Sequence, residues 1–289
     1  MAELSLDGGE YEPLEEILRL DNGLRRRLGY PLRMHAQAQP WAAAGSGLKD
    51  CHTVSLRYTF ESQIEGTEAE LALENASDCR IIFNGETVES VRTGTYVDMS
   101  IDVIRLGKLK RGLNTMLVSV PYDAALNLEA VYVLGDFGVR LKGSRAIITE
   151  KPAALCFGDI SAQDMAFYSG NVEYLFDFDA PGDGRIVLSA TCFRCPAIAV
   201  EIDGRRAGLI AFSPYEACIG NVAEGRHTVR LTAFGNRMNT FGPLHLCDYH
   251  RTSQSPDAWR TSGARWSYEY RTAPAGIMKR PELLFYGKN

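Results

Sequence analysis

The sequence predicts an all-β protein made of two tandem jelly-roll-like antiparallel β-sandwiches, with a short helical segment at the N-terminus. From about Val54 onward, short runs rich in Val, Ile, Leu, Phe and Tyr alternate with Gly, Asn, Asp and Pro, as in strands joined by turns. The same order of strands and turns occurs twice, and no helical pattern separates the strands. These observations favour two antiparallel sandwiches over a fold that contains a parallel sheet.

An internal repeat appears when the chain is aligned with itself. The paired segments are 54–62 with 172–180, 69–88 with 184–207, and 109–122 with 222–235. Asn84-Gly85 and Asp203-Gly204 occupy equivalent places, and both dipeptides are typical of tight hairpin turns. In each copy, the last strand then begins with a Gly-x-(Asn/His)-Thr motif. We therefore expect one structural unit that is used twice.

Changes along the chain predict the domain boundaries. Residues 12–28 carry Leu and Ile near helical spacing, interrupted by Asp21-Asn22-Gly23, which predicts two short helices. A strand ends in the polar turn of 140–152 and a Pro follows, which favours a boundary there. We expect three parts: a helical tether or linker over 1–40, a first β-sandwich over 41–145 and a second β-sandwich over 146–289.

The bulk composition excludes several classes of function. The chain has 289 residues, 23% of them charged, and a net charge of −5 without a long block of one sign, so we expect neither a nucleic-acid nor a membrane partner. No apolar run approaches the roughly 18 residues of a membrane span, and the N-terminus lacks the features of a leader. Seven scattered Cys in apolar, strand-like runs indicate buried, reduced thiols. We expect a cytoplasmic protein.

The Cys and His spacing provides a weak argument for a metal. Cys192 and Cys195 form a C-x-x-C pair, and His245, Cys247 and His250 follow later. This spacing matches no standard zinc finger or ribbon, and residues three apart on a strand point to opposite faces. We therefore expect buried thiols, no metal site and no cofactor. A calcium ion in the acidic turn of 179–183 is the weaker alternative.

An ordered series of short motifs covers nearly the whole chain, from about Glu15 to Tyr286. The motifs are DNGLRRRLGYP, QPW, LEAVYVLGDFGV, FYSGNVEYLFDF, VEIDGRRAGLIAFSPYEACIG and GNRMNTFGPLH. Together they resemble the C-terminal β-sandwich region of large bacterial glycoside hydrolases of the family 2-like and α-L-rhamnosidase-like types, whose galactose-binding-like domains flank a barrel. The resemblance implies carbohydrate as the ligand and an upstream catalytic barrel, in cis or in trans, as the partner.

The second repeat matches that family type best. The matching positions belong to sugar-binding sandwich domains and are Asp203, Gly204, Ala207, Gly208, Pro214, Tyr215, Asn239, Thr240, Phe241, Gly242, Pro243 and His245. The family's catalytic carboxylates lie in the barrel, which takes roughly 250 residues by itself and cannot fit beside two sandwiches. We expect that this chain alone contains no catalytic residue and is not an enzyme.

Carboxylates in the sequence do not change that expectation. Hydrolysis of a glycosidic bond needs a pair of them, and the chain has 36 acidic residues, so pairs always exist. Asp136, for example, is expected to cap a turn or to bind a backbone amide between the two domains, because no orienting motif accompanies it. The sequence also lacks a G-x-S-x-G elbow, a P-loop and a Rossmann fingerprint.

Aromatic rings beside polar groups provide the chemistry of sugar binding, because the C–H face of a pyranose stacks on a ring while its hydroxyls take hydrogen bonds. On this basis the candidate carbohydrate-binding residues are Arg237, Asn239, Phe241, His245, Tyr215, Trp41, Trp259 and Trp266. The alternative for each Trp is packing: Trp41 would plug one end of the first sandwich, and Trp259 and Trp266 would pack the C-terminal tail onto the second.

The sequence thus predicts a non-catalytic accessory region of a glycoside hydrolase that binds carbohydrate or shapes the catalytic cleft. The alternative is a purely structural or assembly module, in which the same surfaces pack on a barrel or form an oligomer without binding free sugar.

Overall fold

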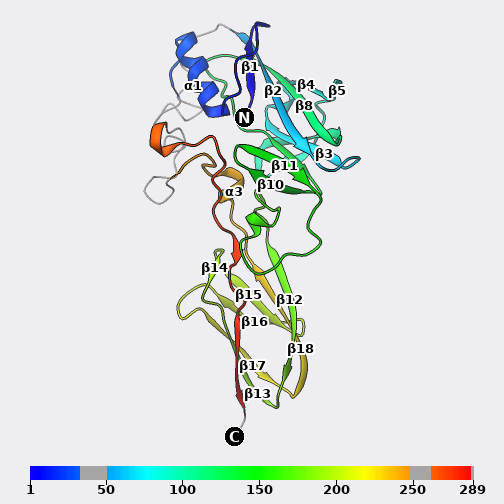
Figure 1. Cartoon of the computed structure of the whole chain (residues 1–289), viewed down its shortest axis with the longest axis vertical. Helices are drawn as coiled ribbons and strands as arrows, with labels where there is room; N and C mark the ends of the chain where they lie inside the picture. Colours follow the sequence, from blue (N-terminus) through cyan, green and yellow to red (C-terminus); the bar gives the residue numbers. More distant parts are fainter. Residues whose placement is uncertain (33–50, 248–261, 288–289) are drawn as a thin grey trace. The chain divides into compact units, whose positions relative to one another are not determined.

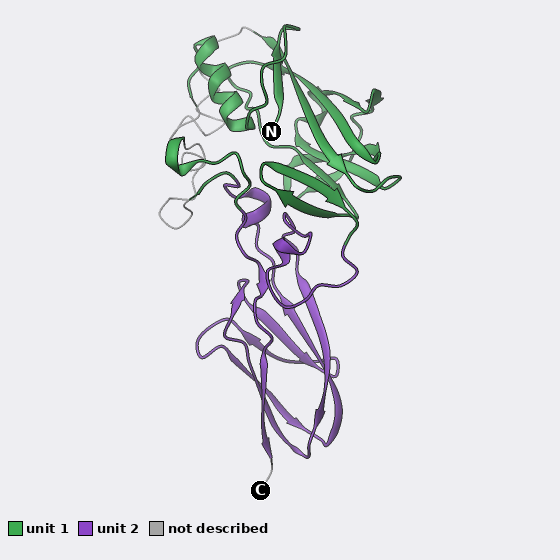
Figure 2. Ribbon diagram, in the orientation of Figure 1, with its two compact units in different colours: residues 1–151, 245–271 green, residues 152–244, 272–289 purple. Residues whose placement is uncertain are grey.

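The computed structural model describes residues 1–32, 51–247 and 262–287, and the chain divides into two compact units (Figures 1 and 2). Unit 1 comprises Met1–Lys151 and His245–Arg271, and unit 2 comprises Pro152–Leu244 and Thr272–Asn289. Both units consist mainly of β-sheets, so the predicted all-β sandwich class is confirmed. Every pairing between described strands is antiparallel except that of β11 with β2, which is parallel.

The described residues of unit 1 form two sheets. The first has the order β10-β11-β2-β8-β4-β5, with β1 paired to β2, and the second has the order β6-β7-β3-β9. The strands of the first sheet are β1 (Glu3–Leu6), β2 (His52–Ser62), β4 (Arg80–Phe83), β5 (Glu86–Val88), β8 (Gly112–Tyr122), β10 (Gly138–Lys142) and β11 (Arg145–Thr149). Those of the second are β3 (Glu68–Glu74), β6 (Arg92–Tyr96), β7 (Asp98–Lys108) and β9 (Tyr132–Gly135).

The two long strands of the first sheet, β2 and β8, present one continuous apolar face. Side chains alternate along a strand, so residues two apart in β2 lie on the same face. One part of this face, including Met116 and Val118, packs with the second sheet. The other part, including Val54 and Val120, packs against the helix α1 (Ile17–Leu28). The helix and β1 therefore both belong to the core of unit 1. The sequence had indicated a tether over this segment.

Helix α1 runs unbroken across Asp21-Asn22-Gly23, so the prediction of two short helices was wrong. The Glu16 side chain accepts a hydrogen bond from the backbone N–H of Arg19 at the start of the helix, and Gly29 ends it with φ 71°. Asp21 is fully buried and its Oδ2 accepts from Nε of Arg25 at 2.9 Å. This interaction ties Asp21 into the helix, which overrides the turn preference of the Asp-Asn-Gly sequence.

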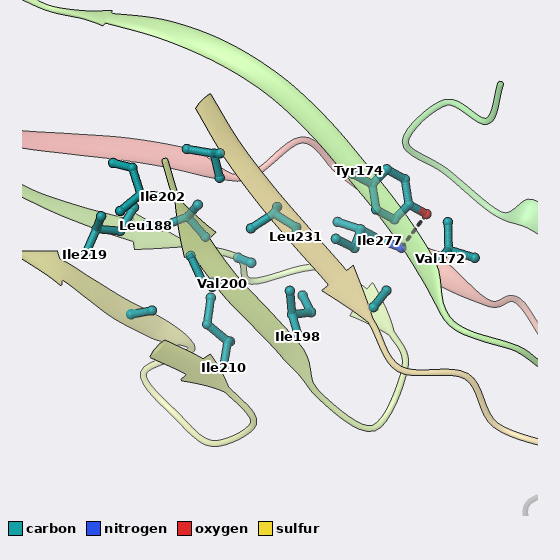
Figure 3. Close-up of a cluster of buried hydrophobic side chains, with 14 of the residues drawn as sticks. Val172, Tyr174, Leu188, Ile198, Val200, Ile202, Ile210, Ile219, Leu231 and Ile277 are labelled. Carbon is teal, nitrogen blue, oxygen red and sulfur yellow. Dashed lines mark hydrogen bonds between the residues drawn. The ribbon is translucent and has the colours of Figure 1, made fainter. Parts of the chain in front are cut away.

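Unit 2 is a sandwich around the core shown in Figure 3. Its sheets have the orders β12-β18-β15-β16 and β17-β13-β20, and β14 pairs with β19. The strands are β12 (Val172–Ala180), β13 (Gly184–Ser189), β14 (Phe193–Arg194), β15 (Ile198–Ile202), β16 (Arg205–Ile210), β17 (Glu216–Val222), β18 (Gly225–Ala233), β19 (Gly276–Ile277) and β20 (Glu282–Gly287). Val200 and Leu231 of the first sheet and Leu188 of the second are fully buried in this core.

The predicted internal repeat is confirmed by the strand orders. The order β2-β8-β4-β5 in unit 1 corresponds to β12-β18-β15-β16 in unit 2, and β7-β3-β9 corresponds to β17-β13-β20. Each unit thus places its first and last repeated strands side by side, with β2 paired to β8 and β12 paired to β18. Unit 1 adds α1, β1 and further strands to this common arrangement.

The two predicted hairpin turns also have the same structure. Both central residues have positive φ, with 50° and 90° for Asn84-Gly85 and 48° and 74° for Asp203-Gly204, as a type I′ turn requires. The Asn84 side chain accepts from the backbone N–H of Thr115, and the Asp203 side chain accepts from that of Thr228, each at 3.0 Å. The Thr of the Gly-x-(Asn/His)-Thr motif is therefore the residue that holds the turn.

Candidate functional site

The predicted binding residues are divided between the two units. His245 and Trp266 belong to unit 1, whereas Arg237 belongs to unit 2. Trp41 and Trp259 lie outside the described residues. The chain passes from unit 2 to unit 1 between Leu244 and His245, within the motif that sequence analysis treated as one loop.

His245 and Trp266 lie together in a cluster that also includes Arg19 of α1. We call it the Trp266 cluster; its members are Glu15, Arg19, His245, Trp266, Tyr268 and Tyr270. All six belong to unit 1. Trp266 therefore packs within unit 1. The alternative role predicted for it was packing onto the second sandwich.

Backbone hydrogen bonds fix the framework of this cluster. Leu246 and Trp266 form an antiparallel bridge, and the backbone N–H of Ser267 donates to the carbonyl of His245 at 2.9 Å. The backbone N–H of Tyr270 donates to the carbonyl of Gly143, in the turn between β10 and β11, at 3.1 Å. The segment that carries the three aromatic residues is thus attached to the first sheet of unit 1.

The rings of the cluster are in mutual contact. The centroids of His245 and Trp266 are 5.8 Å apart in a stacked arrangement, and those of His245 and Tyr270 are 4.9 Å apart. Tyr268 meets Trp266 edge-on at 4.2 Å. Contacts of this kind between aromatic rings are favourable, and they hold the rings in fixed orientations.

Two charged groups complete the cluster: Glu15, which precedes α1, and Arg19, which belongs to it. The Arg19 guanidinium lies over the Trp266 ring, 4.3 Å from its centroid, and its Nε is 3.0 Å from Oε1 of Glu15. The Tyr268 hydroxyl donates to Oε2 of Glu15 at 3.1 Å. The side chains of Arg19 and Glu15 are 33% and 22% exposed, and Tyr268 is 47% exposed. Water and small solutes therefore reach this part of the cluster.

Burial changes the ionisation of the groups beneath this surface. It raises the pKa of the Glu16 carboxyl and lowers the pKa of His245. It also raises the pKa of the Tyr270 phenol. His245 is therefore neutral at neutral pH, and its Nδ1–H donates to the Ser267 carbonyl at 2.9 Å. The arrangement is one of aromatic rings and fixed hydrogen-bonding groups, which is suited to binding.

The remaining predicted residues have separate environments in unit 2. Asn239, in the short helix α3 (Met238–Phe241), is buried, and its side-chain amide bonds both the N–H and the carbonyl of Ala273 at 2.8 Å. It therefore braces the chain. Arg237 is exposed just before α3, and Phe241 is half-buried. Tyr215 is exposed, with its ring edge-on to Phe193 at 5.4 Å.

A small pocket in unit 2 lies beside Asn239. It has space for about one water molecule and is lined in part by Tyr168, Arg194 and Asn236. This volume is far below that of pockets that bind small molecules, which are roughly 300 Å³ or larger. We therefore place the candidate ligand surface in unit 1.

The cysteines differ from expectation. All seven are free, and only Cys79 and Cys195 are partly buried, so the prediction of mostly buried thiols was wrong. Burial raises the pKa of Cys79 and of Cys195 to about 11, which makes both thiols poor nucleophiles at neutral pH. Among the residues that the structure describes, no three His, Cys, Asp or Glu side chains gather as a metal site would require. No helix within the described ranges has the length and apolar character needed to cross a membrane.

Sequence reasoning missed Glu15, Arg19, Tyr268 and Tyr270. The alternating aromatics of Trp-Ser-Tyr-Glu-Tyr at 266–270 are a signal that points to the last two. Glu15 and Arg19 are four residues apart at the start of a helix, a spacing that predicts an ion pair but gives no indication of the aromatic partner.

Comparisons with known proteins provide little further information. No family model matches the sequence, and no curated protein matches it. One solved structure that is similar is a rhamnosidase from Novosphingobium sp. PP1Y, with 16% sequence identity and a TM-score of 0.30. The match covers 82% of this chain and 22% of the rhamnosidase. The chain therefore spans about a fifth of that protein's length, and at this TM-score the likeness carries no functional argument.

Proposed function

We propose that this chain is a non-catalytic accessory region of a glycoside hydrolase and that it binds carbohydrate through the Trp266 cluster. The observation that carries the proposal is the exposed Tyr268 ring, held beside an Arg19–Glu15 ion pair on a rigid framework. The motif resemblance described above adds the catalytic partner: an upstream barrel, in cis or in trans.

The chemistry of the cluster fits a sugar. The apolar C–H face of a pyranose stacks on an aromatic ring, and the residue Tyr268 is 47% exposed. Hydroxyl groups of a sugar both donate and accept hydrogen bonds, and Glu15 accepts whereas Arg19 donates. Bonds to charged groups are stronger than those between neutral groups. One ring and one ion pair therefore provide both parts of sugar recognition.

The cluster is also ordered before any ligand arrives. Tyr268 is held by its hydrogen bond to Glu15 and by its contact with Trp266, and Arg19 is held over the Trp266 ring. Side chains that are already fixed lose little conformational entropy on binding, which strengthens the binding of a small ligand.

A purely structural role is the second candidate, and the same contacts favour it. Arg19 and Trp266 join α1 to a segment that lies more than two hundred residues later in the chain, so the cluster also consolidates unit 1. If this is the only role, removal of the Tyr268 ring will change stability and leave no sugar affinity to lose.

The test compares two tyrosines with matched surroundings. Tyr268 is 47% exposed and lies 5.9 Å from the Arg19 guanidinium, and Tyr286 of unit 2 is 49% exposed and lies 5.0 Å from that of Arg185. We expect calorimetric titration with a panel of neutral mono- and oligosaccharides to identify a ligand. Tyr268→Ala is expected to weaken its binding by about tenfold or more, and Tyr286→Ala to leave it unchanged.

Two outcomes contradict the proposal. In one, no sugar of the panel binds the folded wild-type chain. In the other, a sugar binds, but with equal affinity to the wild type and to Tyr268→Ala, which places the site elsewhere on the chain.

A further inference from the structure

The second repeat has a histidine at the position where the first has an asparagine, in the motif that holds the hairpin turn. In unit 1, Nδ2 of Asn84 donates to Oδ1 of Asn114 at 2.9 Å. In unit 2, Nδ1 of His227 lies 2.7 Å from Oδ2 of Asp203. The two contacts are equivalent in the repeat, but only the one in unit 2 can carry charge.

His227 bridges two turns through both ring nitrogens. Nδ1 contacts the carboxylate of Asp203, between β15 and β16, and Nε2 lies 2.9 Å from the carbonyl oxygen of Ala223, between β17 and β18. The ring also stacks on Phe178, with centroids 5.5 Å apart. The His227 side chain is 13% exposed, whereas that of Asp203 is 49% exposed.

The two acceptors determine the protonation state of the ring. A carbonyl oxygen and an ionised carboxylate oxygen accept hydrogen bonds and have no proton to donate. A neutral imidazole carries one N–H and donates only one bond, whereas the imidazolium donates two. The bridge is complete only when His227 is protonated.

We propose that His227 is a pH-dependent latch that, as an imidazolium, joins the β15–β16 and β17–β18 turns of unit 2 and releases one of them when it loses its proton. Unit 1 has no counterpart to this device at the equivalent place, because Asn84 and Asn114 do not titrate. The latch makes one end of the unit 2 sandwich sensitive to pH.

Asp203 is the charged group that favours the protonated form of His227. The pKa of His227 is raised, chiefly by its hydrogen bond to Asp203, and the pKa of Asp203 is lowered, chiefly by the same bond. Phe178 of β12 pairs with His227 in the sheet, so Asp177 and Asp179 point to the opposite face, where Arg226 of β18 pairs with Asp177. The remaining charged groups nearby are Arg205, beside Asp203, and Asp183 and Glu224, in the adjoining turns.

The direction of the pH effect follows from these shifts. A raised pKa for His227 means that its contribution to stability is present at low pH and is lost as the pH rises through the folded-state pKa. A lowered pKa for Asp203 means that the same bridge is also lost when the pH falls through the carboxyl's folded-state pKa. The latch therefore closes in the window between the two.

Nuclear magnetic resonance of the full chain tests the latch directly. We expect the His227 ring to titrate above the usual value for histidine, which is about 6.5, and to carry protons on both nitrogens below its titration midpoint. A titration midpoint at or below the usual value would overturn the proposal. His227→Asn identifies the resonances.

Hydrogen exchange in the same sample adds a control from within the molecule. The Thr228 amide is bonded to Asp203, and the Thr115 amide is bonded to Asn84, at equivalent positions. After correction for intrinsic exchange, we expect protection of Thr228 to fall as the pH rises from about 6 to about 9, and that of Thr115 to stay constant within about twofold. In His227→Asn, Thr228 should show no such fall. Parallel behaviour of the two amides in the wild type would contradict the latch.

Discussion

A buried ion pair in α1 leads to the most specific stability prediction. Asp21 and Arg25 have side chains that are 0% and 3% exposed. Oδ1 of Asp21 accepts from the Tyr122 hydroxyl at 3.1 Å and from the backbone N–H of Leu128 at 3.2 Å, while Oδ2 accepts from Arg25. We predict that Asp21→Ala destabilises unit 1 strongly, because it leaves the Arg25 charge buried without a counterion.

The magnitude follows from the environment of the pair. Removal of one partner from a buried, hydrogen-bonded ion pair costs about 3–5 kcal/mol. Arg25 retains bonds to the backbone carbonyls of Pro31, Ala124 and Leu126, which orient its guanidinium but do not neutralise it. With a urea m-value of about 2 kcal/mol/M, the unfolding midpoint should fall by about 2 M.

Tryptophan fluorescence during urea unfolding measures this change in unit 1. The chain has three tryptophans, and all three positions fall in the sequence ranges of unit 1. Lys108→Ala is the control, because Lys108 pairs with Glu68 on the surface at 3.7 Å and its loss should change stability by less than about 0.5 kcal/mol. A loss of less than about 1 kcal/mol in Asp21→Ala would refute the reasoning that the pair is essential to the core of unit 1.

Two further predictions concern unit 2 and can be checked by urea unfolding followed through its resolved amide resonances. Asn239→Ala removes both hydrogen bonds to Ala273 and should cost about 2–4 kcal/mol; equal stability to wild type would contradict the bracing role. Gly235→Ala places a methyl group 2.0 Å from the Ser169 carbonyl oxygen, so the backbone must shift, and a variant as stable as wild type would contradict this packing.

Much of the fold could be predicted from the sequence because its signals are local. Asn-Gly and Asp-Gly dipeptides specify hairpin turns through their preference for positive φ, and both turns form where they were expected. The repeat could be recognised because equivalent strands keep the same alternation of apolar residues. The helix was harder, because Asp-Asn-Gly signals a turn and only the burial of Asp21 beside Arg25 overrides that signal.

The site was less predictable because its members come from distant parts of the chain. The motif from Gly235 to His245 suggested one binding loop, but Asn239 bonds the backbone of Ala273, and a backbone partner leaves no trace in sequence. Arg19 lies over Trp266, and local patterns cannot predict contacts across such a separation. The sequence did identify the residue types of the cluster, which are aromatic rings beside polar groups.

Titration of the full chain with sugars, followed in its proton–nitrogen correlation spectrum, tests the carbohydrate-binding proposal most directly. The three tryptophans give three indole N–H resonances, and Trp266→Phe identifies the one from the cluster. We predict that one sugar at millimolar concentration shifts the Trp266 resonance in a saturable manner, and that Tyr268→Ala weakens this response. If no resonance of the Trp266 cluster responds to any sugar in the panel while the chain remains folded, the proposed function is contradicted.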